Sequence, residues 1–85
     1  MVNALDILAA RDAAVTGRAK RIREAAGLTQ SDVARHIGTN ASTVSRWENG
    51  VRRPTGAEAE RLALLLRELA NYLASPSEHE EVKRN

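Results

Sequence analysis

Cysteine and phenylalanine are absent from this 85-residue sequence, which has only one tryptophan, one tyrosine and two prolines. Without cysteine, neither a disulfide framework nor a thiolate zinc site is available. The longest purely aliphatic run spans residues 62–66, far short of the roughly 20 apolar residues that a membrane span needs. The N-terminal segment lacks the basic start of a secretory signal. We therefore expect a soluble intracellular protein with one modest core.

Residues that carry catalytic chemistry are also sparse. His36 and His79 are the only histidines, and no nucleophile stands in a recognisable arrangement with a base. A lone histidine in a polar helical segment is ordinarily a surface residue, and the "HEE" at residues 79–81 lies in a polar tail. We expect no enzymatic activity, no cofactor and no metal site.

The net charge of +2 is unevenly distributed. Between residues 17 and 53, eight basic and three acidic side chains give a net charge of +5, whereas residues 1–16 carry −1 and residues 54–85 carry −2. A basic segment is either a solvated surface or a surface that binds a polyanion such as nucleic acid. Charge alone leaves both interpretations open.

The hydrophobic pattern and the capping residues predict helices separated by short breaks. Gly27, Gly38 and Gly50 are placed to end three of them, whereas Gly17 either ends the first helix or lies within a longer one. The predicted helices span residues 3–15, 16–26, 30–37, 41–49 and 56–73. No strand pattern competes, so we predict an all-α fold, a compact bundle of about five helices.

Two of these helices, residues 30–37 and 41–49, are short and joined through a glycine-containing turn, which is the helix-turn-helix arrangement. In the second, Val44 and Trp47 are spaced to face the core. A helix that enters the DNA major groove must pack one face on its domain while the other approaches base edges. The small or polar outward residues and one arginine suit that task, and they are Ala41, Ser42, Ser45 and Arg46.

The stretch "GLTQSDVARHIGTNASTVSRWENGVRRP", residues 27–54, resembles the phage-repressor and Cro-type helix-turn-helix family, also called the XRE family. The matching positions are Gln30, Ala34, Gly38, Val44, Ser45, Trp47, Glu48, Asn49, Gly50 and Pro54. With its flanking helices the resemblance covers about residues 16–70. It departs from the family at Thr39, where many members have an apolar residue. Members bind DNA through the second motif helix, usually as dimers on inverted repeats.

The resemblance implies specific roles. Ala41, Ser42, Ser45 and Arg46 are expected to contact bases, with Arg46 suited to guanine and Ala41 to a thymine methyl. DNA-backbone contacts are expected from Gln30, Asn40, Thr43, Asn49, Arg52 and Arg53. For Asn40, capping of the helix through the Thr43 amide is the stronger interpretation, and contact with phosphate or adenine is the alternative.

A second set of residues is expected to support the recognition helix. Trp47 is interpreted as core in preference to a base-stacking residue, Ala34 lies where the motif helices cross, and Gly38 occupies the turn. The resemblance pairs Glu48 with Arg23 in a partly buried ion pair, which removes Arg23 from the DNA-binding charge.

These expectations combine into three regions: an N-terminal extension helix (1–15), a helix-turn-helix domain (16–74) and a flexible tail (75–85). The extension either covers the Leu-rich last helix or joins a dimer interface. We expect a small Cro-like repressor in a bacterial or phage-infected cytoplasm, binding an inverted-repeat operator in double-stranded DNA as a homodimer. The alternative is an antitoxin-like or other protein-interaction module that uses the same scaffold for a protein partner.

Overall fold

The computed structural model describes residues 3–75, without the side chain of Val15. Over these residues the chain forms helices and no strand, which confirms the all-α prediction. The elements are α1 (Ala4–Thr16), α2 (Arg18–Ala25), α3 (Gln30–Ile37), α4 (Ala41–Glu48) and α5 (Gly56–Leu73). The predicted flexible tail lies, apart from Ser75, outside the described residues. No helix within 3–75 combines the length and hydropathy of a membrane-spanning segment.

Side-chain caps define where α1 and α3 begin. At α1, Asn3 Oδ1 accepts a hydrogen bond from the Asp6 amide at 2.9 Å, and Asp6 accepts one from the Asn3 amide in return. Thr29 and Asp32 form the same reciprocal pair at α3, with distances of 3.0 and 2.9 Å. Each pair satisfies amides that the first helical turn leaves without partners.

Two glycines with positive φ decide how consecutive helices are connected. Gly17 has φ of +88° and ends α1, so the first two predicted helices are separate elements. Gly38 has φ of +90° in the turn between α3 and α4, and an added Cβ would lie 3.3 Å from the Arg61 guanidinium. A side chain at Gly38 would therefore meet both backbone strain and a close neighbour.

The core gathers around Trp47 and Ile37, both nearly inaccessible to solvent. Leu62 and Leu65 of α5 are buried there, and Leu66 and Leu69 pack partly against the same cluster. The leucines of the Leu-rich last helix are thus mostly used within the fold. Leu73, the last residue of α5, is half-buried.

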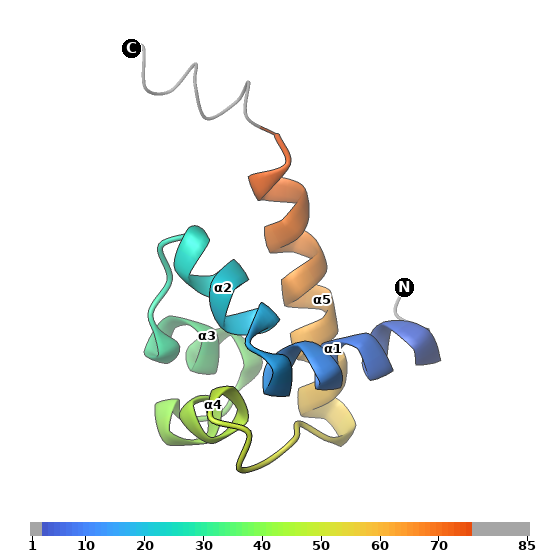
Figure 1. The fold of residues 1–85 in the computed structure, drawn as a ribbon, viewed down its shortest axis with the longest axis vertical. Coiled ribbons are helices and arrows are strands. Elements are labelled where there is room, and N and C mark those ends of the chain that lie inside the picture. The colour runs from blue at the N-terminus through green and yellow to red at the C-terminus, as the bar shows by residue number, and fades with distance from the viewer. Residues whose placement is uncertain (1–2, 76–85) are drawn as a thin grey trace.

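The N-terminal helix α1 packs across α5 (Figure 1). Its inner face consists of small side chains, and Ala10 and Ala14 belong to the core cluster. Asp6 of α1 also forms an ion pair with Arg67 of α5. The extension therefore covers the Leu-rich helix, which was one of its two expected roles.

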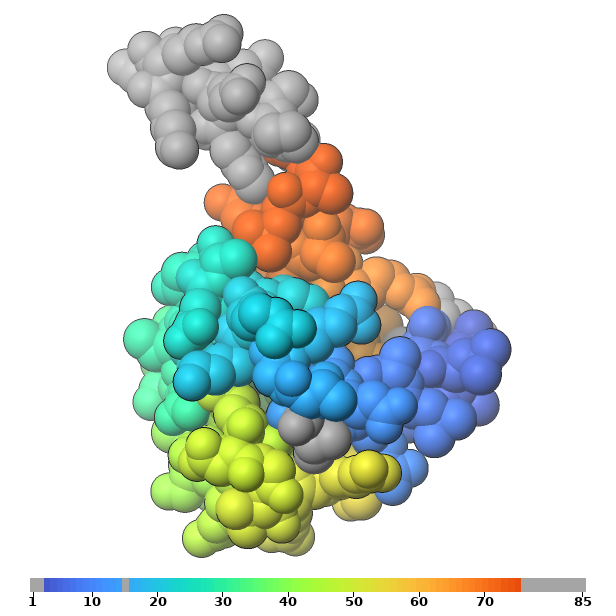
Figure 2. Space-filling model, viewed as in Figure 1, coloured from blue at the N-terminus to red at the C-terminus, as the bar shows by residue number. Residues whose placement is uncertain are grey.

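Figure 2 shows α2 between the α4 end of the molecule and the projecting end of α5.

Candidate nucleic-acid interface

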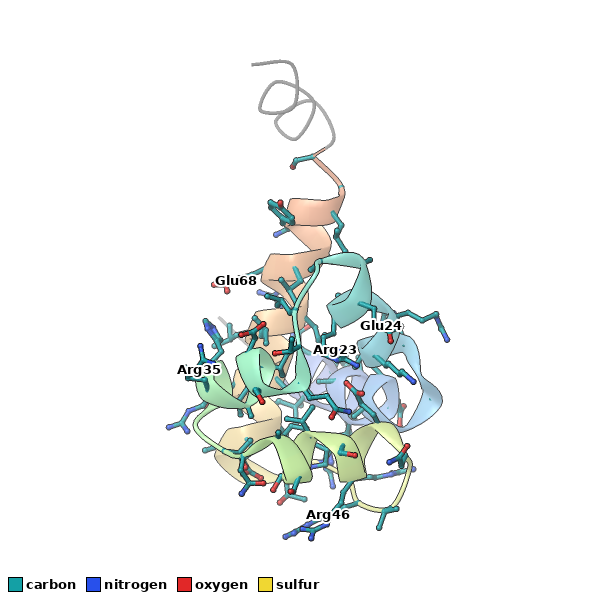
Figure 3. The ribbon with its side chains drawn as sticks, turned by 90° about the vertical axis from the view of Figure 1, so that its left-hand side faces the viewer. Arg23, Glu24, Arg35, Arg46 and Glu68 are labelled. Carbon is teal, nitrogen blue, oxygen red and sulfur yellow. The ribbon has the colours of Figure 1, made fainter. Side chains whose placement is uncertain are left out.

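Helix α4 lies along one end of the molecule, with Arg46 pointing away from the body (Figure 3). Its inner face holds Val44 and Trp47, each 2% exposed, and both belong to the core cluster. Trp47 is therefore a core residue, as predicted, and its ring is not available for stacking on a base. Packing of this face against α3 and α1 determines which side of α4 faces solvent.

The opposite side of α4 is lined by the four residues predicted to contact bases, and we call it the outer face. Ser42 and Arg46 are exposed, while Ala41 and Ser45 are half-buried. All four line one open hollow of about 390 Å³, and Gln30 from the start of α3 completes it. The structure thus brings Ala41, Ser42, Ser45 and Arg46 together on one surface.

Asn40 caps α4 and orients Thr43. Asn40 Oδ1 accepts hydrogen bonds from the Thr43 amide at 2.9 Å and from the Thr43 hydroxyl at 3.1 Å. This confirms the predicted cap. Thr43 is only 9% exposed, because it lies beside Val44 on the inner side of the helix. This placement does not suit the DNA-backbone contact expected of Thr43, since its side chain faces the fold.

The predicted ion pair between Arg23 and Glu48 lies at the C-terminal end of α4. Arg23 Nε and Nη2 donate to the two Glu48 carboxylate oxygens at 2.7 and 3.0 Å. The side chains are 11% and 6% exposed, respectively. Arg23 Nη1 also donates to the backbone carbonyl of Leu28 at 2.9 Å, so the pair ties α2, the α2–α3 connection and α4 together.

Gln30 is the third member of this cluster, which the sequence did not predict. Gln30 Nε2 donates to Glu48 Oε1 at 2.9 Å across 18 residues of sequence. No local pattern indicates this contact, because it depends on how closely the start of α3 approaches the end of α4. Gln30 is consequently held between the buried ion pair and the hollow on the outer face.

The protonation equilibria of the ion pair follow from its surroundings. Burial on its own would raise the pKa of Glu48, but hydrogen bonds from Arg23 and then Gln30 outweigh it and hold the pKa below its ordinary value. The hydrogen bond to Glu48 raises the pKa of Arg23. Both groups are therefore charged at neutral pH.

The loop after α4 carries further polar residues toward the same end of the molecule. The Arg46 carbonyl accepts hydrogen bonds from the amides of Val51 and Arg52 at 2.9 and 3.3 Å, which fold the chain back over the helix end. The exposed side chains of this loop are Asn49, Arg52 and Arg53. Pro54, which follows them, is buried. The basic loop is therefore anchored directly beside the outer face.

A family model described as helix-turn-helix matches residues 20–73. The chain belongs to this helix-turn-helix family. It is a DNA-binding transcription regulator of the XRE type. Searches among curated proteins and among solved structures gave no significant match.

In this helix-turn-helix protein, α3 and α4 correspond to the two motif helices, with Gly38 in the turn between them. The matched segment covers α3, α4 and α5 completely and most of α2. Helix α1 lies outside the match. The shared motif thus coincides with the hollow, the buried ion pair and the basic loop.

Proposed function

We propose that this regulator inserts α4 into the DNA major groove and recognises its site through the outer face. One observation carries the proposal: the four outer-face residues share a single solvent-open hollow, whereas the core packing of α4 comes from its other side. Small side chains at the start of the helix allow its backbone to approach the base edges.

The outer face offers three kinds of base contact. The Ala41 methyl suits the methyl group of thymine, and the hydroxyls of Ser42 and Ser45 accept or donate to several bases. The Arg46 guanidinium can donate two hydrogen bonds to guanine O6 and N7. Arg46 therefore provides the strongest discrimination, and we assign it a guanine in each half-site.

Contacts to the DNA backbone are proposed for the exposed polar residues around this face. Asn49, Arg52 and Arg53 follow α4 directly, and Asn40 precedes it. Each phosphate that an arginine neutralises releases counterions. The logarithm of the binding constant therefore falls with the logarithm of the salt concentration, with a slope of about −0.9 for each contact. Replacing Arg52 by alanine should weaken binding to all sequences and reduce the slope by roughly that amount.

We further propose a homodimer that binds an inverted repeat and represses by occupying its operator. Two α4 helices would then meet half-sites roughly 34 Å apart. Support comes from large apolar side chains that the described part of the monomer leaves exposed, namely Leu5, Leu8, Val51, Leu64 and Tyr72. Sedimentation should give twice the chain mass of 9.3 kDa, and a monomer at micromolar concentration would contradict the dimer.

A protein-binding role remains the second candidate, because one observation favours it. Leu5 and Leu8 of α1 are 75% and 52% exposed on the side of the helix away from the core alanines. A protein partner could cover this pair while α4 binds DNA. Loss of partner binding in Leu5→Ser/Leu8→Ser, with DNA affinity unchanged, would support that role.

The experiment that tests the proposed function is selection of binding sites from a random double-stranded library at two salt concentrations. We compare the wild type, Arg46→Ala and the control Arg35→Ala, which removes an exposed arginine that does not line the hollow. The expected result is an inverted repeat whose guanine preference relaxes only in Arg46→Ala. Salt-sensitive binding without any sequence preference would contradict sequence-specific recognition.

A further inference from the structure

We infer that Gln30 is a base-contacting residue and that it selects adenine. The inference rests on the proposed function, and it replaces the phosphate contact that the family resemblance implies for Gln30. The primary observation is that Gln30, from α3, lines the same hollow as the four outer-face residues of α4. The surface that faces the bases therefore extends beyond the recognition helix.

Glu48 fixes the orientation of the Gln30 carboxamide. Gln30 Nε2 donates to Glu48 Oε1 at 2.9 Å, and the same carboxylate accepts two hydrogen bonds from Arg23. Turning the amide over would place its oxygen against a carboxylate oxygen, and two acceptors have no proton to share. The nitrogen of the amide therefore stays toward Glu48.

The remaining groups on Gln30 are one N–H donor and the carbonyl oxygen. Within residues 3–75, no hydrogen bond engages that oxygen. A donor beside an acceptor matches the major-groove edge of adenine, where N7 accepts and the N6 amino group donates. Guanine presents two acceptors, thymine one acceptor and cytosine one donor, so only adenine satisfies both groups. A phosphate accepts only, so it would engage the remaining N–H and leave the Gln30 oxygen to water, whereas adenine pairs with both groups.

The start of α4 leaves room for such a contact. Ala41 has only a methyl group, and Ser42 is small and exposed, so neither fills the hollow in front of Gln30. Ser42 and Arg46 stand four residues apart on one side of the helix. The adenine at Gln30 and the guanine at Arg46 therefore belong to the same half-site.

The test is site selection from the random double-stranded library with the full chain and three variants. Gln30→Met keeps the side-chain length and removes both hydrogen-bonding groups. Gln30→Lys keeps a donor for Glu48 but has no acceptor. Ser31→Ala is the control, since Ser31 is exposed in the same helical turn and does not line the hollow. Thermal unfolding of each variant verifies that it is folded.

We expect the wild type and Ser31→Ala to prefer adenine at one position of each half-site by roughly 5- to 150-fold, the range for a bidentate base contact. Both Gln30 variants should lose this preference and keep the guanine preference assigned to Arg46. With Gln30→Lys, the same position should shift toward guanine.

The outcomes separate this inference from the function on which it rests. If the wild type selects no sequence, the proposed function itself fails. If the wild type selects a site and Gln30→Met weakens all sequences equally with the adenine preference intact, Gln30 contacts phosphate and only this inference is overturned.

Discussion

The two sides of α4 differ sharply in what surrounds them. On the inner side, Trp47 and Val44 are each 2% exposed, and Glu48 accepts three hydrogen bonds from residues of other helices. On the outer side, Ser42 and Arg46 are exposed along an open hollow. The eight residues of α4 thus attach the helix firmly to the domain on one side and leave a surface open to a partner on the other.

This difference separates stability from recognition within one short helix. Helices of this length are not stable alone in water, so tertiary packing has to hold α4 in place. Substitutions on the inner side should therefore change the free energy of unfolding. Substitutions on the outer side should change DNA binding and leave folding nearly unaffected.

The largest effect is expected for Trp47→Ala. Removing this fully packed side chain should lower the free energy of unfolding by about 3–5 kcal/mol, which is close to the total stability of many small domains. Urea denaturation measures the loss. Ser42→Ala, on the other side of the helix, is the control and should change stability by no more than about 0.5 kcal/mol. Equal losses in both variants would remove the distinction between the two sides.

Arg23→Met should come next, because it leaves the Glu48 carboxylate buried without a cation. Breaking a fully buried ion pair from one side costs about 3–5 kcal/mol, and this partly buried pair should cost somewhat less. Replacing both partners, as in Arg23→Met/Glu48→Leu, should recover much of the loss in urea denaturation. The control Arg35→Met removes a 77% exposed arginine and should have little effect. A double variant less stable than Arg23→Met would contradict this account of the pair.

The same ion pair should make stability depend on pH in the acid range. Since the folded-state pKa of Glu48 lies below its ordinary value of about 4.5, the pair stabilises the fold fully above that unfolded pKa. This stabilisation is lost as the pH falls through the lower, folded-state pKa. Denaturation midpoints from pH 7 to pH 2 should therefore decline less steeply in Glu48→Gln than in the wild type. Parallel curves would show that Glu48 contributes nothing to the acid transition.

Asn40→Ala should have a smaller effect, about 1 kcal/mol, because it removes the cap of α4. Thermal unfolding measures the change. Asn49→Ala provides the matched comparison at the other end of the helix, where the exposed side chain makes only a 3.3 Å hydrogen bond to Ser45. It should weaken DNA binding with little loss of stability. A larger stability loss in Asn49→Ala than in Asn40→Ala would reverse the assigned roles.

Local signals in the sequence were sufficient to predict the cap at Asn40 and the burial of Val44 and Trp47. These features depend on residues within one turn of each other. The Arg23–Glu48 pair came from the family resemblance, since 25 residues separate its partners.

Other features depend on how the helices cross, and no local pattern encodes that. The hydrogen bond from Gln30 to Glu48 and the burial of Thr43 both arise from the approach of α4 to its neighbours. The sequence also left open whether residues 1–15 cover α5, because small alanines fit several helix surfaces. Packing of Ala10 and Ala14 in the core answers that question.

A double-mutant cycle between Arg46 and its guanine measures whether the outer face of α4 recognises bases. Affinities are measured for the wild type and Arg46→Ala on the selected operator and on the same operator with that guanine replaced by adenine. We expect a coupling free energy of about 1–3 kcal/mol together with unchanged stability of the variant. A coupling near zero, with both changes acting independently, would contradict base recognition by the outer face of α4.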